Sequence, residues 1–203
     1  MIVSNFVASA FSQARARQDE LVRRWISISH KVGSLLPQSL LTMSVQRVGE
    51  LDVLLRAIED EFRSAGPDKF GFNAHYQIMM GDLWVGSLYE ICRLLSERKL
   101  SPQTDPFKNL ARELKLIRIP LEKHEIASDR RISGSLTLET GPDGSENRRE
   151  YEYRTNDNTR SHIMPQGFSE KFSQMWHVID VERSQSYWIE RRELSDRFMS
   201  IWL

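Results

Sequence analysis

The chain has 203 residues, of which 40% are hydrophobic and 28% are charged, and its formal net charge at pH 7 is zero. This length suits one large domain or a domain with an insertion, and the composition excludes a disordered chain. Proteins that bind nucleic acid mainly by neutralising phosphates carry an excess of basic residues. Any nucleic-acid contact of this chain therefore has to be a local basic patch.

The single cysteine, Cys92, cannot form an intramolecular disulfide, which suits a reducing environment. Its neighbours Ile91 and Leu94 indicate a buried, inert thiol rather than a nucleophile. The N-terminus has no basic segment before an apolar run, and no apolar run reaches the roughly 20 residues that span a bilayer. We therefore expect a cytoplasmic protein with no signal peptide and no membrane partner.

Apolar residues at intervals of three, four and seven predict two long helices in the first third of the chain. The first should span residues 3–32 and end at Gly33, before Pro37. The second should span residues 41–62 and be closed by the Gly-Pro-Asp turn at 66–68. The charged residues of this second helix are expected to face mostly solvent; they are Glu50, Asp52, Arg56, Glu59, Asp60, Glu61 and Arg63.

Two further helices are predicted in the middle of the chain. One begins near Asn73 and contains Gly81 and Gly86, each of which costs about 1 kcal/mol relative to alanine in a helix interior. We interpret these glycines as a place where a neighbouring helix approaches closely. The other has Asp105 as its N-cap and Pro106 at its first position, and its apolar seam extends to residue 124.

Residues 129–167 are polar, and two stretches in them alternate between polar and apolar or aromatic side chains. These stretches, 135–140 and 149–154, flank a Gly-Pro-Asp-Gly turn at 141–144 and predict a β-hairpin. We expect the whole segment to be an insertion that projects from the core.

The last segment, residues 168–203, regains helical periodicity and holds Trp176, Trp188 and Trp202. Such an aromatic segment is expected to cover the bundle or to contact another subunit. The charged stretches 190–193 and 196–197 are interpreted as the solvated face of the last helix. The prediction for residues 1–203 is thus a single all-α domain, a bundle of five or six helices with the hairpin insertion at 129–167 and the aromatic segment at 168–203.

Several kinds of site are excluded by the motifs. The chain has no phosphate-binding glycine loop, no dinucleotide-binding glycine fingerprint and no Cys/His spacing that suits zinc. A di-metal helical bundle needs Glu-x-x-His pairs, and none of the five histidines has a glutamate three positions before it. We therefore expect no metal and no cofactor.

The remaining candidate is an arginine followed six residues later by a histidine, Arg118 and His124, on a late helix. This pair and its helical context, residues 73–128, resemble the HEPN superfamily. The resemblance implies metal-independent RNA cleavage in a toxin or defence component, with RNA as the ligand and a homodimer as the assembly. It also implies a charged residue on the preceding helix. We place Glu90 with the catalytic pair, and Asp82 and Lys123 as substrate-binding candidates.

The chemistry of this pair suits RNA cleavage. A histidine can take the proton of a 2′-hydroxyl or protonate the leaving oxygen, and an arginine can hold the phosphate. Structural roles compete, because His124 could extend the apolar seam and Arg118 could pair with Glu122. Six residues on a straight helix set the two side chains roughly 120° apart, so a kink at Pro120 would decide whether they share a cleft.

Two alternatives stay open at this point. A second match to the spacing pairs Arg23 or Arg24 with His30 on the first helix. The competing function belongs to a different class, namely a non-catalytic helical protein that recruits a protein partner through its aromatic segment, residues 168–203.

Overall fold

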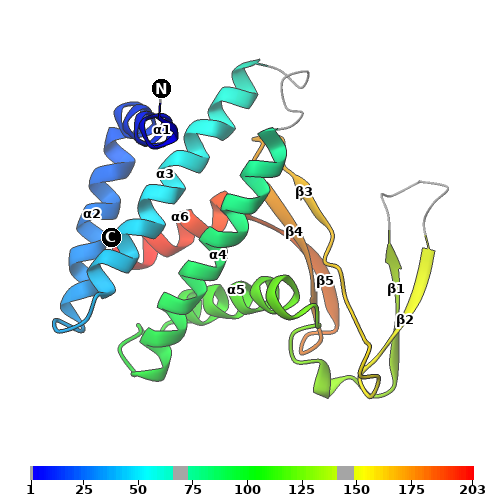
Figure 1. The fold of residues 1–203 in the computed structure, drawn as a ribbon. Helices are drawn as coiled ribbons and strands as arrows, with labels where there is room; N and C mark the ends of the chain where they lie inside the picture. The colour runs from blue at the N-terminus through cyan, green and yellow to red at the C-terminus, as the bar shows by residue number, and fades with distance from the viewer. Residues whose placement is uncertain (1, 66–72, 141–148) are drawn as a thin grey trace.

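The computed structural model describes residues 2–65, 73–140 and 149–203 (Figure 1). The helices in this part are α1 (Val3–Arg17), α2 (Asp19–Ser34), α3 (Leu41–Ala65), α4 (Asn73–Glu97), α5 (Asp105–Lys123) and α6 (Arg191–Trp202), with a 3-10 turn at Asp129–Arg131. The strands are β1 (Ser135–Thr140), β2 (Arg149–Arg154), β3 (Gln166–Phe168), β4 (Gln174–Asp180) and β5 (Gln185–Glu190). The protein is mostly helical, but the predicted all-α class is wrong because two antiparallel sheets accompany the helices.

The helix predicted over residues 3–32 is two helices, α1 and α2, which are separated at Gln18. The backbone of Gln18 leaves the helical region (φ −121°, ψ 37°), and its side-chain amide donates to Oδ2 of Asp60 on α3 at 2.9 Å. Arg15 and Arg17 of α1 also form ion pairs with Glu50 and Glu61 of α3. These contacts to α3 hold the one-residue break between α1 and α2. The apolar periodicity continues across this break, so it does not predict it.

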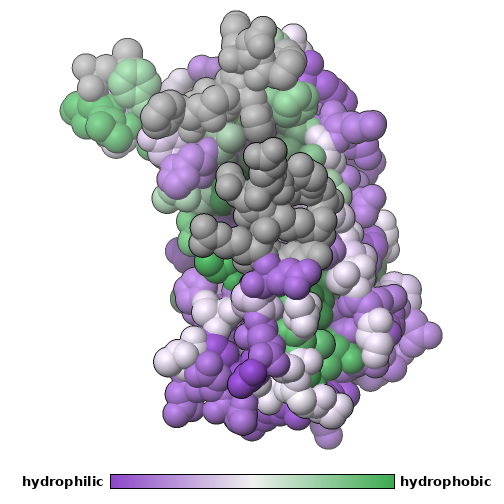
Figure 2. All heavy atoms as spheres, turned by 90° about the vertical axis from the view of Figure 1, so that its right-hand side faces the viewer, coloured by the Kyte–Doolittle hydropathy of each residue, from purple (hydrophilic) through white to green (hydrophobic). Residues whose placement is uncertain are grey.

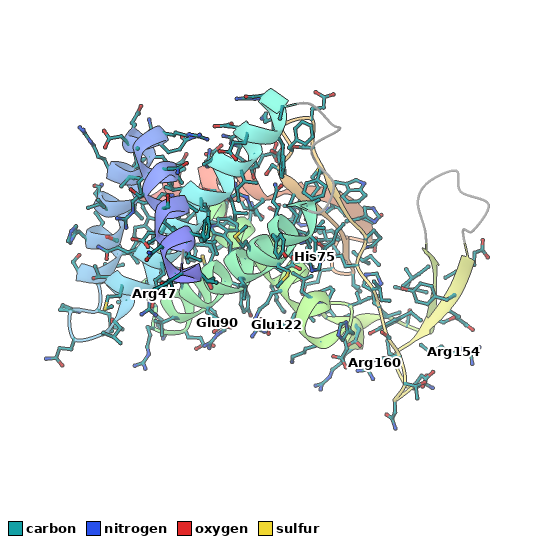
Figure 3. All side chains as sticks on the ribbon, turned by 45° about the horizontal axis from the view of Figure 1, so that its top comes forward. Arg47, His75, Glu90, Glu122, Arg154 and Arg160 are labelled. Atoms are coloured by element: carbon teal, nitrogen blue, oxygen red, sulfur yellow. The ribbon has the colours of Figure 1, made fainter. Side chains whose placement is uncertain are left out.

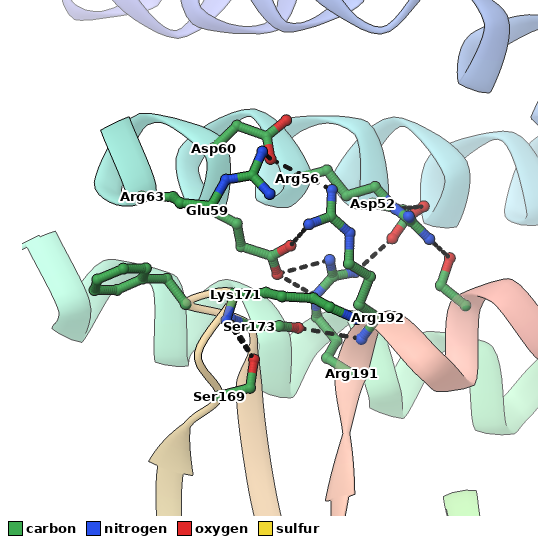
Figure 4. Close-up of polar contacts among 12 residues, drawn as sticks. Asp52, Arg56, Glu59, Asp60, Arg63, Ser169, Lys171, Ser173, Arg191 and Arg192 are labelled. Atoms are coloured by element: carbon green, nitrogen blue, oxygen red, sulfur yellow. Dashed lines mark hydrogen bonds and ion pairs between the residues drawn. The ribbon is translucent and has the colours of Figure 1, made fainter. Parts of the chain in front are cut away.

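Three of the seven charged side chains of α3 that were predicted to face mostly solvent are buried, namely Asp52, Arg56 and Glu59, whereas Glu61 and Arg63 are exposed as predicted. Asp52 and Glu59 are 0% exposed, and both bind the guanidinium of Arg191, which is also 0% exposed and begins α6 (Figure 4). The predicted solvated face at residues 190–193 is likewise wrong for Glu190 and Arg191, which are both buried. A buried ion carries a large desolvation penalty, so these charges are stable there only as partners of one another.

The hydrogen bonds of Arg191 are directed at two turns of α3. Its Nε and Nη2 donate to Oε1 of Glu59 at 3.0 and 2.8 Å, and its Nη1 donates to Asp52. Its guanidinium also lies 5.2 Å from the ring centroid of Trp84 on α4. One side chain therefore connects α3, α4 and the junction between β5 and α6.

The two carboxylates of this cluster differ in their pKa. Burial opposes the ionisation of Asp52, but Arg191 and Arg56 together outweigh it and lower the pKa of that carboxyl. At Glu59, burial outweighs the attraction of Arg191 and raises the pKa. Asp52 also accepts a hydrogen bond from Nε1 of Trp25 at 3.0 Å, which adds to the stabilisation of its charge.

The predicted hairpin is confirmed: β1 and β2 pair antiparallel, with Leu136 opposite Tyr153. The turn at 141–144 lies outside the described residues. The expectation that residues 129–167 stay outside the core is wrong at Tyr153, which is 1% exposed. Its hydroxyl donates to Oδ2 of Asp129 at 2.9 Å and accepts from the backbone N–H of Ile126 at 3.2 Å, so the hairpin is attached to the segment that follows α5.

The aromatic C-terminal segment is helical only in α6, since residues 166–190 form the sheet β3-β4-β5. In β4 every second residue is buried, and Trp176 lies opposite Ile189 of β5. This is the period of two that a strand with one covered face requires. Trp176 and Phe198 are fully buried, so the segment covers the helices, which is one of the two arrangements predicted for it.

The close approach predicted at Gly81 exists, but a strand makes it rather than a helix. A Cβ at this position would lie 1.8 Å from Oε1 of Gln174 on β4. At Gly86 the nearest atom is Oε1 of Glu122 on α5, at 3.6 Å. Gly81 therefore lets α4 pack closely against β4, whereas a Cβ at Gly86 would make only an ordinary van der Waals contact with α5, so the close approach predicted there is not found.

His162 gives the stability a dependence on pH. This buried histidine is hydrogen-bonded to the hydroxyl of Tyr151 at 2.9 Å, and burial together with His177 lowers its pKa to about 4. An unfolded histidine has a pKa near ~6.5, so below that value the unfolded chain binds a proton that the folded chain does not.

This difference should remove stability as the pH falls from about 6.5 to 4, by roughly 3 kcal/mol in total and about 2 kcal/mol by pH 5. Urea denaturation at pH 7.5 and 5 should show this loss in the wild type and a clearly smaller loss in His162→Gln. Equal losses in the two proteins would show that His162 does not titrate in this way.

Candidate functional site

The candidate site lies where the end of α5 meets α4. Arg118 of α5 forms ion pairs with Glu90 of α4 at 3.2 Å and with Glu122, one turn further along α5, at 2.7 Å. Its guanidinium also lies 5.0 Å from the ring centroid of Tyr89. Figure 3 shows Glu90 and Glu122 next to each other on this side of the molecule. The structure thus brings together Arg118 and Glu90, and it also contains the competing pair of Arg118 with Glu122.

His124 ends α5. The helix continues through Pro120, which has no N–H to donate to the carbonyl of Leu116, and it stops three residues later at Lys123. His124 then takes the left-handed conformation (φ 56°, ψ 29°), and its N–H donates to the carbonyl of Pro120 at 3.0 Å. Its side chain is exposed, so the alternative in which His124 extends the apolar seam is wrong. The left-handed cap directs the chain away from the direction that a further helical turn would have followed.

Arg118 and His124 therefore have different environments. The side chain of Arg118 is 21% exposed and held by two carboxylates, whereas His124 is free to meet a ligand from solvent. The structure shows no hydrogen bond or ion pair between these two described residues. The second match to the spacing is a solvated helix surface, because Arg23 and Arg24 pair with Asp19 and Glu20 of their own helix.

A hollow of about 360 Å³ adjoins the end of α5; we call it the basic groove. Its charged lining residues are Lys115, Lys123, Glu125, Asp129, Arg130 and Arg131. Four cations and two carboxylates give this lining a net charge of 4 − 2 = +2. Both carboxylates are already bound by Arg160, at 2.8 Å from Glu125 and 3.0 Å from Asp129.

Three cations of the basic groove are open to an anion from solvent. Lys115, Lys123 and Arg130 are exposed, and none of them forms an ion pair with another described residue. Lys115 and Lys123 lie two helical turns apart on the same face of α5. His124 follows Lys123 directly, so the exposed imidazole lies between two lining residues of the groove in the sequence.

A second hollow of about 390 Å³ adjoins the basic groove and shares Lys115 and Ser128 with it. It lies between α4, α5 and β4, and its lining includes Tyr89 and the apolar side chains of Ala111, Leu116 and Ala127. The sequence analysis missed Lys115, Arg130 and Arg131. The signal for them was weak: two lysines eight positions apart on one helix face, and two adjacent arginines after the helix.

Asp82 is not part of this region. Its Oδ1 accepts hydrogen bonds from Nε2 of Gln174 at 2.9 Å and from Nε1 of Trp176 at 3.1 Å, so it connects α4 to β4. Burial raises the pKa of this carboxyl, although both hydrogen bonds oppose the shift. Asp82 precedes Glu90 by more than two turns, roughly 12 Å along α4. Its contacts indicate a structural role.

Cys92 is fully buried, as predicted, and burial raises the pKa of its thiol. In residues 2–65, 73–140 and 149–203 there is no group of three or more His, Cys, Asp or Glu side chains placed to hold a metal ion. Within the same ranges, no helix has both the length and the apolar composition that crossing a bilayer requires.

Comparison with known proteins provides no relative from which the function of this site could be transferred. No protein-family model matches the chain, and no match was found among curated proteins or among solved structures.

Proposed function

We propose that the protein binds single-stranded RNA along the basic groove and cleaves it without a metal, with His124 as the catalytic acid or base. The observation that carries this proposal is an exposed histidine that directly follows the groove residue Lys123 in the sequence, at a groove with three exposed cations that form no ion pair with another described residue. The cations suit a phosphate backbone, and an imidazole titrates in the range that proton transfer at neutral pH requires.

In this reaction the 2′-oxygen of a ribose attacks the adjacent phosphorus atom. The bond from phosphorus to the 2′-oxygen forms and the bond to the 5′-oxygen breaks, which leaves a 2′,3′-cyclic phosphate and a 5′-hydroxyl. A neutral His124 takes the proton of the 2′-hydroxyl, or a protonated His124 gives its proton to the leaving 5′-oxygen. A second copy of the chain would supply the other proton transfer, in line with the homodimer that the HEPN resemblance implies.

Arg118 has a conditional role in this proposal. Two carboxylates neutralise its charge in the free protein, so a phosphate has to replace one of them before it can bind the guanidinium. Glu122 is 47% exposed and can turn into solvent, while Glu90 keeps the arginine in place over Tyr89. Glu90 is then a positioning residue, and Lys123 is a phosphate contact.

The alternative function, recruitment of a protein partner through residues 168–203, receives less support. The large aromatic side chains expected to form that surface are mostly used within the fold, with Trp176 and Phe198 fully buried. Trp188 is 47% exposed but also lies 5.1 Å from the ring of His177, centroid to centroid.

The basic groove is tested by the salt dependence of RNA binding. Each phosphate contact to a single strand contributes about −0.7 to the slope of log K against log salt. The variant Lys115→Gln/Lys123→Gln/Arg130→Gln should therefore bind a single-stranded RNA more weakly, with a slope shallower by roughly 2, in fluorescence anisotropy titrations at several salt concentrations.

The matched control is Arg23→Gln, which removes an exposed cation from α2, far along the chain from the groove. This control should leave both the affinity and the slope unchanged. Wild-type binding by the triple variant would show that RNA, if bound, is bound elsewhere.

A further inference from the structure

The N-terminal half of α1 projects from the body of the protein with apolar side chains in solvent. Ile2 is 71%, Val3 76%, Phe6 58% and Val7 52% exposed, and the buried residue of α1 is Ala14, near its other end. Figure 2 shows this end of α1 as a hydrophobic projection at the upper left. We call residues 2–10 the arm. It contains no charged residue, so no hydrated charge offsets the cost of exposing its apolar side chains to water.

A second unpartnered apolar surface lies on α4. Tyr76, Met79 and Leu83 are 59%, 50% and 65% exposed and follow one another at intervals of three and four, so they share one face of the helix. We call this face the α4 stripe. In Figure 1 α1 is seen nearly end-on, and α4 crosses in front of α6.

We propose that two copies of the chain form a symmetric dimer in which the arm of each copy packs on the α4 stripe of the other. Such an exchange is closed, because each copy offers one arm and one stripe and both are used. A second copy suits both surfaces: the arm has no charge to bury, and the one acidic residue within the stripe, Asp82, is turned towards Gln174 and Trp176 of its own chain.

The exposed apolar area of the arm and the α4 stripe agrees with a second copy of the chain as the partner. The seven exposed apolar side chains of the arm and the stripe present on the order of 900 Å² per copy, similar to the ~800 Å² per partner that a standard specific interface buries. A lipid surface suits the arm less well, because an interfacial helix normally carries lysines and arginines beside its apolar face.

The proposed dimer has a consequence for the candidate site. Leu83 and Glu90 are seven residues apart on α4, so the stripe leads towards the Arg118–Glu90 ion pair. A partner seated on the stripe would border this pair in both copies. The inference itself does not rest on RNA cleavage, because the exposed apolar surfaces alone define the interface.

Two single variants test the exchange by sedimentation velocity at micromolar concentration. The wild type should sediment as a dimer, and Phe6→Asp and Leu83→Asp should each be monomeric with the circular dichroism spectrum of the folded wild type, because both side chains are exposed in the folded chain. The matched control Ile163→Asp changes another side chain that is 76% exposed and should remain dimeric.

Mixing the two monomeric variants distinguishes arm exchange from other dimers. The arm of Leu83→Asp is intact and the stripe of Phe6→Asp is intact, so the mixture should contain dimers held by one arm–stripe contact. A dimer in which two stripes meet directly would not be restored by mixing. A monomeric wild type at 100 µM, or a mixture without dimers, would overturn the proposal.

Cross-linking places the contact independently. Phe6→Cys/Met79→Cys, with the native Cys92 buried, should form a disulfide between copies on mild oxidation and run as a covalent dimer on a non-reducing gel. Met43→Cys in place of Met79→Cys gives the control, since Met43 is 47% exposed outside the stripe. Equal cross-linking of the two pairs would contradict the assignment.

Discussion

Replacement of Arg191 by methionine is expected to lower the free energy of unfolding by roughly 3–5 kcal/mol, because it leaves two buried carboxylates without their shared cation. Asp52 and Glu59 are fully buried and accept five hydrogen bonds from cations and Trp25 that water cannot replace. Asp52 keeps Arg56 at 3.1 Å after the change, but Glu59 keeps only Arg192, 3.7 Å away. Protonation of Glu59 would limit the loss, since burial already raises its pKa.

Urea denaturation followed by circular dichroism measures this change. The control is Arg197→Met on the same helix, whose arginine is 42% exposed and pairs with Glu113, and its effect should stay near 1 kcal/mol or below. A second substitution, Glu59→Gln, should lower the free energy of unfolding less in the Arg191→Met background than in the wild type. A loss below 1 kcal/mol for Arg191→Met would show that the cluster does not hold α6 to α3.

Replacement of His124 by alanine is expected to reduce the rate of RNA cleavage by 10²–10⁴-fold, the usual contribution of a general acid or base. The side chain is exposed at the end of α5, so the folded stability should not change. Single-turnover cleavage of a fluorescent RNA in the presence of EDTA measures the rate. The control is His30→Ala, which removes another exposed histidine, on α2, and should retain the wild-type rate.

Substitution of Arg118 is expected to affect both RNA cleavage and stability, whereas substitution of His124 should affect cleavage alone. Arg118→Gln should weaken cleavage and also remove the cation that Glu90 and Glu122 share, which leaves Glu90 paired with Arg93 alone. A variant that loses stability but cleaves at the wild-type rate would assign Arg118 a structural role alone. Wild-type cleavage by His124→Ala would remove the histidine from the mechanism.

The sequence predicted the helices that are amphipathic over many turns. The bounds expected near residues 41 and 73 agree with α3 and α4, and the alternating stretches at 135–140 and 149–154 form the hairpin. In each case the pattern within the segment itself determines the structure, because one face packs against the rest of the protein. The periodicity within each segment was therefore sufficient to place α3, α4 and the hairpin.

The errors arose where distant residues decide the structure. Asp52 and Glu59 have the spacing of a solvated helix face, and only Arg191, far along the chain, makes their burial favourable. Trp176 and Ile179 fit a helical interval, but the partner strands β3 and β5 select the extended conformation. The basic groove was also hidden, because Lys115 and Arg130 approach each other only after α5 ends at His124.

The chemistry of cleavage is tested most directly by the products of an RNA incubated with the purified protein in EDTA. The RNA should be cut to fragments that end in a 2′,3′-cyclic phosphate and begin with a 5′-hydroxyl. An otherwise identical strand with a single 2′-deoxyribose at the cleaved position should remain intact there. Cleavage of the deoxy-substituted linkage, or an absence of cleavage by the wild type while His124 is intact, would contradict the proposed role of the histidine.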